Sequence, residues 1–523
     1  MGKKRVAIIG AGASGLTAIK SCLDEGLEPV CFEKSDNIGG LWYYREERDD
    51  QACVYKSTVI NTSKEVMCYS DFPIPDDFPN YMHNRLVLKY YHLFCDRFDL
   101  RKYIHFHTKV DSAVFADDFE ETGQWKVKTT LQETGKSVTE IYDAVLVCTG
   151  HHCTPHLPEF DGLKDFNGRV LHTHDYLTPE GFENKRILII GVGNSGCDAA
   201  VELSSPASQV YLSTRRGMWV LHRLFNGRIF FPQRIFDVLP NSVKEKAFRS
   251  TVESRVDHKF LGIQPEHSLL AQHPTVNDFL PNCIVNGSVI IKPDVKRFTS
   301  TGVVFQDGTT EDLDVVILGT GYLFKFPFLE DSVIKVEQNK LPLYKYVFPV
   351  NLQHPTIAFL GYIQPLGAIN PISEIQARWA TRVFKGLTKL PSSDQMKADM
   401  MSKEEAMAKR YISSQRHTIQ VDFIKYMDEV ALEFGVKPDF WKMLLSDPVL
   451  ALKCVFGPYT PYQYRLVGPG QWSGARDAIM TISERVNKPL QSRKVQVSQS
   501  GSLLNSWLFY AIVLSVALYI LWR

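Results

Sequence analysis

The chain has 523 residues, enough for two to four domains of ordinary size. Hydrophobic residues make up 44% of it and charged residues 22%, which excludes disordered and collagen-like chains. Its 59 basic and 58 acidic side chains leave a net charge of +1, so no excess charge indicates a nucleic-acid partner. The ten cysteines form no Cys-x-x-Cys pair and show no metal-ligand spacing with histidine, so we expect neither a disulfide framework nor a metal site.

A dinucleotide-binding unit is predicted at the N-terminus. The β-branched run 5–9 ends at a Gly-x-Gly-x-x-Gly turn, a helical pattern follows, and a second strand at 29–32 ends at Glu33. This order of strand, turn, helix, strand and acid is that of the Rossmann fold. The glycines allow the turn and the approach of a pyrophosphate, and the acid accepts hydrogen bonds from ribose hydroxyls. The predicted cofactor contacts are Gly10, Gly12, Ser14, Gly15 and Glu33.

The same pattern recurs 181 residues later, with a strand at 187–190, a second glycine turn, a helix and a strand at 209–213. Glu33 lies 23 positions after Gly10, and the equivalent position in the second unit is Thr214, which Arg215 and Arg216 follow. A carboxylate there would repel a 2′-phosphate, whereas guanidinium groups bind it. The second unit is therefore predicted to bind NADP through Gly191, Gly193, Asn194, Ser195, Gly196, Ser213, Thr214 and Arg215.

Two unlike dinucleotide sites on one chain indicate two redox cofactors, and FAD in the first site with NADPH in the second is the simplest assignment. Two apolar runs that end in Thr-Gly, 143–150 and 314–321, are predicted to return the chain between the domains. The predicted fold is α/β, with two Rossmann-type domains. The predicted boundaries are 1–153 and 331–442 for the FAD domain, 154–213 and 297–330 for the NADPH domain, 214–296 for a helical insertion and 443–502 for a C-terminal helical segment and linker.

A membrane anchor is predicted at 503–523. The segment from Leu503 to Trp522 is apolar apart from Asn505, Ser506 and Ser515. As a helix it would be about 30 Å long, the thickness of a bilayer core. A buried C-terminal core helix is the alternative, and the sequence does not decide whether the segment spans the bilayer or lies in one leaflet.

The residues between the two units resemble a known family. The run from Phe166 to Tyr176 matches the pattern Phe-x-Gly-x-x-x-His-x-x-x-(Phe/Tyr) of flavin-containing monooxygenases. The runs 39–42, 61–65 and 213–217 and the apolar tail also resemble the vertebrate microsomal members, so the resemblance covers essentially the whole chain. One difference is Gly319, which precedes Thr-Gly-Tyr where the family usually has alanine.

The resemblance implies that NADPH reduces the flavin, which reacts with O₂ to form a C4a-hydroperoxide that transfers one oxygen atom to nitrogen or sulfur. It implies that Asn61 is the active-site asparagine, and that Gly40, Leu41, Trp42, Asn61 and Thr62 contact the cofactor. It also implies an endoplasmic reticulum location with the catalytic domains facing the cytosol, contact with membrane lipid and a possible homo-oligomer. For the signature histidine, His172, and for His174, we expect a positioning role.

Three functions remain open at this point. The first is oxygenation of nitrogen or sulfur in xenobiotics, and the second is Baeyer–Villiger insertion of oxygen into ketones. The third is an NADPH oxidase that releases H₂O₂ by uncoupled turnover. The amount of oxygenated product per NADPH consumed separates the third function from the other two.

Overall fold

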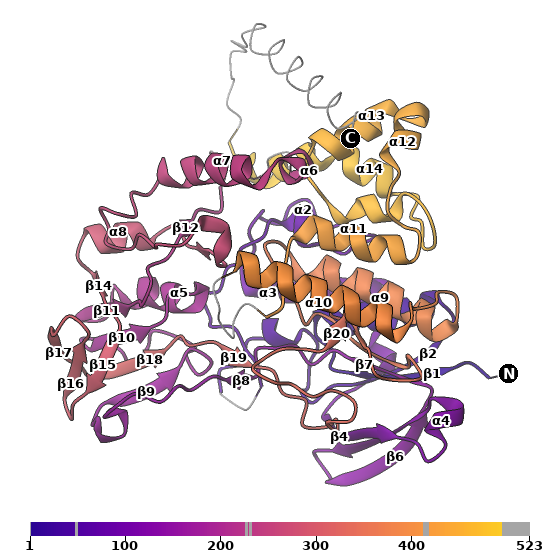
Figure 1. Cartoon of the computed structure of the whole chain (residues 1–523), viewed down its shortest axis with the longest axis horizontal. Helices are drawn as coiled ribbons and strands as arrows, with labels where there is room; N and C mark the ends of the chain where they lie inside the picture. Colours follow the sequence, from indigo (N-terminus) through magenta and orange to yellow (C-terminus); the bar gives the residue numbers. More distant parts are fainter. Residues whose placement is uncertain (1, 48–50, 225–228, 230–232, 412–417, 494–523) are drawn as a thin grey trace, which may run out of the picture.

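Two five-stranded parallel sheets organise the chain (Figure 1). The computed structural model describes residues 2–493, with gaps at 48–50, 225–228, 230–232 and 412–417. Each sheet is built around one of the glycine turns.

The first sheet has the strand order β22-β7-β1-β2-β3. Its strands are β1 (Arg5–Ile9), β2 (Glu28–Phe32), β3 (Ile104–His105), β7 (Ala144–Val147) and β22 (Ile357–Phe359). The central strand is almost wholly buried because helices and loops cover both faces, as is usual for parallel sheets. Helix α1 (Ala13–Asp24) follows the first glycine turn and packs on α9 (Ile369–Lys385).

The second sheet has the order β14-β11-β10-β18-β9. Its strands are β9 (Arg169–His172), β10 (Arg186–Ile190), β11 (Gln209–Ser213), β14 (Val289–Lys292) and β18 (Val315–Leu318). Helix α5 (Asn194–Leu203) follows the second glycine turn and packs on β10, β11 and α8 (Leu280–Val285). This sheet and its helices lie to the left in Figure 1.

The two apolar runs that end in Thr-Gly are β7 and β18, one in each sheet. The chain that leaves each of them forms a short antiparallel pair, β8 (Thr154–Pro155) with β19 (Tyr322–Leu323). This pair lies between the two sheets in Figure 1. Both connections between the domains therefore run side by side.

The segment 214–296 differs from the prediction of a helical insertion. It holds α6 (Gln233–Val238), α7 (Asn241–Glu253) and α8, but also β12 (Val220–Leu221), β13 (Thr275–Val276) and β14. Strand β14 pairs in parallel with β11. The correction has a simple reason: residues 289–291 are all β-branched, and such a run favours a strand.

The other elements extend both domains and the C-terminal region, and β15 to β17 pack on the second sheet. Strands β4 (Thr108–Phe115), β5 (Trp125–Leu131) and β6 (Lys136–Tyr142) form one antiparallel sheet, and β15 (Val295–Phe298), β16 (Gly302–Phe305) and β17 (Thr310–Asp312) form another. The short strands pair as β20 (Leu343–Tyr344) with β21 (Phe348–Pro349), and β23 (Gln364–Pro365) with β24 (Gln420–Val421). The remaining helices are α2 (Lys64–Met67), α3 (Asn84–Arg97), α4 (Phe119–Thr122), α10 (Ser393–Arg410), α11 (Phe423–Glu433), α12 (Phe440–Ser446), α13 (Pro448–Phe456), α14 (Ala475–Met480) and α15 (Ile482–Asn487).

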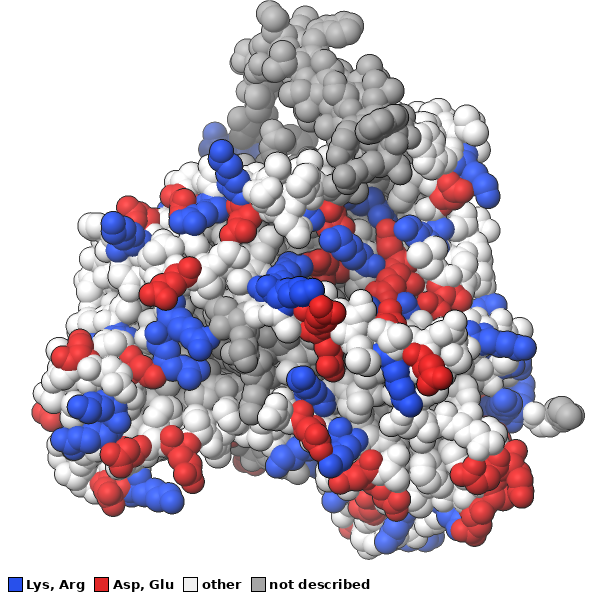
Figure 2. Space-filling model, viewed as in Figure 1, with Lys and Arg blue, Asp and Glu red and all other residues white. Residues whose placement is uncertain are grey.

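Within the described residues, no helix has the length and apolar character needed to cross a membrane. The predicted anchor at 503–523 lies outside the described residues. On the face drawn in Figure 2, acidic and basic side chains are interspersed.

Candidate active site

The first glycine turn is a cradle that side chains would fill. Gly10 has a positive φ of 99°, and a Cβ there would lie 2.8 Å from the carbonyl oxygen of Cys148. A Cβ on Gly15 would lie 1.9 Å from the carbonyl oxygen of Gly10. Helix α1 begins after Gly12, and no side chain caps it. Its first N–H groups therefore remain available to an anion such as a pyrophosphate.

Glu33 is held beside this turn, as the sequence predicts. Its carboxylate is buried and accepts a hydrogen bond from the Ala11 N–H at 2.7 Å, and two more from the N–H and hydroxyl of Ser35 at 2.9 Å. Four lone-pair positions on a carboxylate leave room for a further donor such as a ribose hydroxyl. Ser14 instead bonds the hydroxyl of Ser373, at 2.9 Å, and so ties the turn to α9.

The segment Gly40–Trp42 forms a 3₁₀ turn that packs against the first glycine turn. The Gly39 N–H donates to the Ala11 carbonyl at 3.1 Å, and a Cβ on Gly40 would lie 3.1 Å from Cα of Gly12. Three of the five residues that the resemblance implied as cofactor contacts, Gly40, Leu41 and Trp42, therefore stand next to the predicted pyrophosphate site.

The second glycine turn repeats this geometry. A Cβ on Gly191, where φ is 113°, would lie 2.3 Å from the carbonyl oxygen of Gly319, and one on Gly196 would lie 2.1 Å from that of Gly191. Helix α5 begins after Gly193, again without a side-chain cap. The unusual Gly319 fits closely here, because a Cβ on it would lie 3.2 to 3.4 Å from atoms of the glycine turn and β10.

The residues after β11 have different surroundings. The Ser213 hydroxyl is buried and donates to the carbonyl of Pro293 at 2.7 Å, so it is engaged with the backbone and does not face solvent. Thr214 donates to the carbonyl of Gly217 at 3.3 Å. Arg215 and Arg216 are both exposed. Of the predicted 2′-phosphate contacts, the guanidinium of Arg215 is thus the group most accessible to a ligand.

A cavity of about 370 Å³ reaches both domains. Asn61, Thr62 and Ser63 line it from the first domain, and Asn194 lines it from the second glycine turn. Asn194 is oriented by the Val276 N–H, which donates to its side-chain oxygen at 2.9 Å. Much of the remaining wall is apolar and comes from the insertion and α11: Ile229, Phe236, Phe248, Val252, Leu270 and Ile424.

Asn61 is oriented by Arg223, a residue that the sequence analysis did not single out. Arg223 Nη2 donates to Asn61 Oδ1 at 3.0 Å, and Arg223 Nη1 donates to Asp278 Oδ2 at 2.6 Å. Tyr81 donates to the carbonyl of Arg223 at 2.6 Å, and burial raises the pKa of this tyrosine to about 12. Because Arg223 occupies the oxygen of Asn61, the amide N–H groups of Asn61 are left as donors. The only sequence signal for Arg223 was the richness of 214–296 in arginine and aromatic residues.

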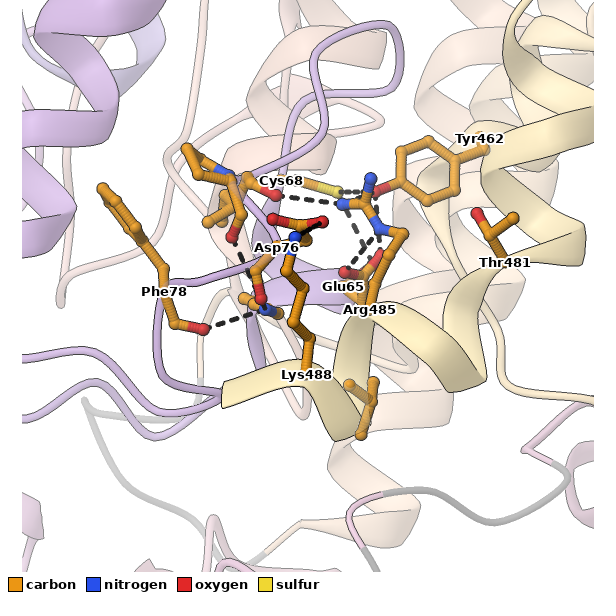
Figure 3. Close-up of polar contacts among 12 residues, drawn as sticks. Glu65, Cys68, Asp76, Phe78, Tyr462, Thr481, Arg485 and Lys488 are labelled. Atoms are coloured by element: carbon orange, nitrogen blue, oxygen red, sulfur yellow. Dashed lines mark hydrogen bonds and ion pairs between the residues drawn. The ribbon is translucent and has the colours of Figure 1, made fainter. Parts of the chain in front are cut away.

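Buried ionic contacts hold the chain just after Asn61 (Figure 3). Lys64 and Glu65 at the start of α2 are both fully buried. Lys64 Nζ donates to the carbonyls of Asp76 and Phe78 at 2.8 Å. Figure 3 shows Tyr462 and Arg485 meeting at Glu65, which accepts hydrogen bonds from the tyrosine hydroxyl at 2.9 Å and from Arg485 Nε at 3.0 Å. Helix α15 is thus fastened to α2.

Replacing Arg485 by methionine should lower the thermal unfolding midpoint by roughly 3 to 5 °C, because it leaves the buried Glu65 carboxylate without its cation. Differential scanning calorimetry measures this change. The control is Arg476→Met on α14. Arg476 is exposed, and its replacement removes an ion pair with Asp447, so the midpoint should shift by about 1 °C. Equal shifts for the two variants would mean that the Glu65 contact is energetically ordinary.

The signature histidine lies at the junction of the domains. His172 ends β9, and its ring lies 5.2 Å from that of Tyr322 in β19. Its Nδ1 accepts a hydrogen bond from the N–H of His174 at 2.9 Å. Burial lowers the pKa of His172 to about 4, so the ring is neutral at physiological pH. A neutral, packed histidine fits the positioning role that the sequence analysis expects.

Two glycine turns with uncapped helices, each on its own parallel sheet, together with a shared cavity, define an oxidoreductase with two dinucleotide-binding domains. The family model described as flavin-binding monooxygenase-like matches residues 3–523. The chain therefore belongs to this family, and the resemblance inferred from its motifs is confirmed. It is an FAD- and NADPH-dependent monooxygenase, with both cofactors as predicted.

Individual relatives agree with this assignment. The chain is 53% identical to flavin-containing monooxygenase 5 of Rattus norvegicus, over 96% of each chain. It is 48% identical to the dimethylaniline monooxygenase [N-oxide-forming] 2 of the same organism, over 95% of each chain. Among solved structures, the S-allyl-L-cysteine S-oxygenase of Allium sativum shares the fold with a TM-score of 0.65 and 24% identity, covering 93% of this chain and 99% of that one.

Proposed function

We propose that the chain transfers one atom of O₂ to soft nitrogen or sulfur nucleophiles of xenobiotics, to ketones by Baeyer–Villiger insertion, or to both, in the cavity that Asn61 and Asn194 line. The observation that carries the proposal is the orientation of Asn61 by Arg223 in a largely apolar wall. Such a wall admits uncharged organic molecules and excludes water from the reacting atoms. A relative at 48% identity is named for N-oxide formation, which supports amines as one substrate class.

The two glycine turns are the proposed cofactor sites. Residues Gly10 to Gly15, Glu33 and the turn 40–42 would hold FAD, and residues Gly191 to Gly196 with Thr214 and Arg215 would hold NADPH. FAD held there would supply the redox chemistry that links NADPH to O₂. The protein binds and orients the cofactors and keeps the cavity dry, and the amide N–H groups of Asn61 donate hydrogen bonds to the reacting oxygen without giving up a proton.

Product analysis tests this proposal. The full-length enzyme is incubated with NADPH and one sulfide, one tertiary amine or one aliphatic ketone, and oxygenated product and H₂O₂ are both counted per NADPH consumed. Our proposal expects oxygenated product from at least the amine and the sulfide. H₂O₂ alone with every probe would instead identify an uncoupled NADPH oxidase.

We also propose that the segment 503–523 anchors the enzyme in the endoplasmic reticulum membrane, with the catalytic domains in the cytosol. The apolar length of that segment supports an anchor. Large apolar side chains are also exposed on α12 and α13, among them Trp441, Leu445, Val449 and Leu452. Helix α13 packs on α14, and α14 on α15, so this surface belongs to the same C-terminal region that leads to the predicted anchor.

Deleting residues 503–523 should move the protein from the membrane fraction to the soluble fraction, because it removes most of the apolar area available to lipid. Fractionation by ultracentrifugation measures this, and FAD content confirms that the truncated enzyme is folded. Continued tight binding to membranes would place the anchor on another part of the molecule, such as α12 and α13.

A further inference from the structure

Asp198 of helix α5 connects the second glycine turn to two segments that lead to Asn61. It lies four positions after Asn194, the first residue of α5. The hydroxyl of Tyr55 donates to Asp198 Oδ2, and Nδ2 of Asn277 donates to Asp198 Oδ1 at 2.8 Å. Both oxygens of one carboxylate on α5 therefore bind groups from other parts of the chain.

The first segment is the loop that runs from Tyr55 to Asn61. Tyr55 precedes the second domain in the sequence, but its ring packs against the core of that domain. The N–H of Lys56 donates to the carbonyl of Leu177, which follows β9, at 2.9 Å. From the start of α3, the side chain of Asn84 donates to the carbonyls of Tyr55 and Lys56 at 3.1 Å. The beginning of the loop is thus fixed to both domains.

The second segment consists of β13 and the two residues after it. The Thr275 hydroxyl donates to the carbonyl of Val192, inside the second glycine turn, at 2.6 Å. Asn277 Oδ1 accepts a hydrogen bond from the N–H of Leu280 at 2.8 Å, so Nδ2 is directed to Asp198. Thr275 and Asn277 are both buried. This segment is therefore held against the turn and α5.

Asp278, the last residue of this segment, completes the connection to Asn61. It accepts hydrogen bonds from the N–H of Arg223 at 3.0 Å and from Nη1 of Arg223 at 2.6 Å. Nη2 of the same arginine donates to Asn61 Oδ1 at 3.0 Å. Two routes therefore lead from Asp198 to Asn61, one along the backbone of a loop and the other through paired side chains.

We propose that Asp198 is a positioning residue for Asn61, which it holds at a fixed place relative to the second glycine turn. This role rests on the proposed function of Asn61 as a hydrogen-bond donor to the reacting oxygen. Asn61 comes from the first domain and the glycine turn from the second, and two domains of one chain move relative to each other unless contacts prevent it. Such motion would disturb the donor, because a hydrogen bond weakens steeply as its geometry departs from the optimum.

The first variant is Asp198→Asn. A carboxylate accepts at both oxygens, whereas an amide has one oxygen and one nitrogen, so either Tyr55 or Asn277 loses its acceptor. With the full-length holoenzyme and benzyl methyl sulfide, the sulfoxide formed per NADPH should fall by about fivefold, with H₂O₂ in its place. KM for NADPH should change by less than about twofold, because the residues proposed to bind NADPH are unchanged.

The matched control is Glu202→Gln. Glu202 lies one turn further along α5 and accepts a hydrogen bond from Tyr176 at 2.8 Å, much as Asp198 does from Tyr55. Within the part of the chain that the structure describes, Glu202 makes no hydrogen bond to either segment that leads to Asn61. This control should leave the sulfoxide formed per NADPH unchanged.

A double variant separates positioning of Asn61 from an independent effect of Asp198. If Asp198 acts through Asn61, replacing it should have no further effect once Asn61 is serine. Asn61→Ser combined with Asp198→Asn should therefore give the same sulfoxide per NADPH as Asn61→Ser alone, within about twofold. Independent contributions would multiply and lower the ratio by about fivefold again.

Hydrogen–deuterium exchange of the resting holoenzyme gives a readout that does not depend on turnover. Asp198→Asn should speed the exchange of amides in the loop from Tyr55 to Asn61, because the loop loses its bond to α5. Exchange in β10 should stay as in the wild type, which shows that the variant is folded. Tyr55→Phe keeps the ring but removes the donor, and it should reproduce both the faster exchange and the lower sulfoxide ratio.

A normal sulfoxide ratio in Asp198→Asn and Tyr55→Phe would overturn the inference. A further loss in the double variant, or unchanged exchange in the loop, would also overturn it. These results leave the proposed oxygenase function intact, because the wild type still forms sulfoxide. A wild-type enzyme that consumes NADPH without oxygenating any probe would overturn the proposed function and this inference together.

Discussion

Replacing Arg215 by alanine should raise KM for NADPH by roughly 10- to 150-fold, the equivalent of about 1.5 to 3 kcal/mol, and leave KM for NADH nearly unchanged. The reason is that a 2′-phosphate loses charge-assisted hydrogen bonds to the guanidinium, while NADH has no phosphate there. The position follows from the spacing after the second glycine turn, and the structure presents this side chain at the surface after β11.

The measurement is the steady-state oxidation of each coenzyme by purified enzyme with FAD bound. The matched control is Arg297→Ala. Arg297 is another exposed arginine of the domain that holds Arg215 and lies on β15, so both KM values should be unchanged. Equal losses with NADPH and NADH would show that Arg215 contributes to general binding or folding, and would remove the assignment of the 2′-phosphate to this residue.

Replacing Asn61 by serine should leave FAD bound and reducible by NADPH but lower the oxygenated product per NADPH by about 10- to 100-fold, with H₂O₂ in its place. Asn61 offers amide N–H groups in the cavity because Arg223 holds its oxygen at 3.0 Å. A serine hydroxyl is shorter and can rotate, so it does not reproduce this fixed donor.

The measurement is the ratio of product and H₂O₂ to NADPH, with flavin content determined on the same sample. Asn282→Ser, at an exposed position on α8, is the control for a change of asparagine to serine that lies outside the cavity. If coupling in Asn61→Ser stays normal, Asn61 has only a structural role in the turn before α2.

Local patterns were enough to predict the two nucleotide-binding units. Glycine at positions 10, 15, 191 and 196 is required by contacts with atoms close in sequence or on a neighbouring strand, and the strands show as short apolar runs. The position of Glu33 follows from the length of one strand–helix–strand unit, and the structure places its carboxylate against the first turn. The role of Asn61 came only from the resemblance, since an asparagine before a helix is an ordinary turn residue.

The contacts between distant segments of the chain were not predictable in this way. Arg223 and Asn61 are 162 positions apart, and Glu65 and Arg485 are 420 apart, so no periodicity or spacing connects them. Strand β14 is different: its β-branched run is a local signal for a strand, but the sequence analysis placed it in a helical insertion, and the structure adds it to the second sheet.

The sequence by itself determined that this protein has two glycine turns on two Rossmann-type units, because backbone sterics act within a few residues. It also predicts that one unit suits a free ribose and the other a 2′-phosphate. Only the tertiary structure decided what surrounds Asn61 and where the insertion joins the second sheet. These features depend on packing between segments that are far apart in the sequence. Many arrangements of these segments are compatible with the local sequence patterns, and the packing of the whole chain selects one of them.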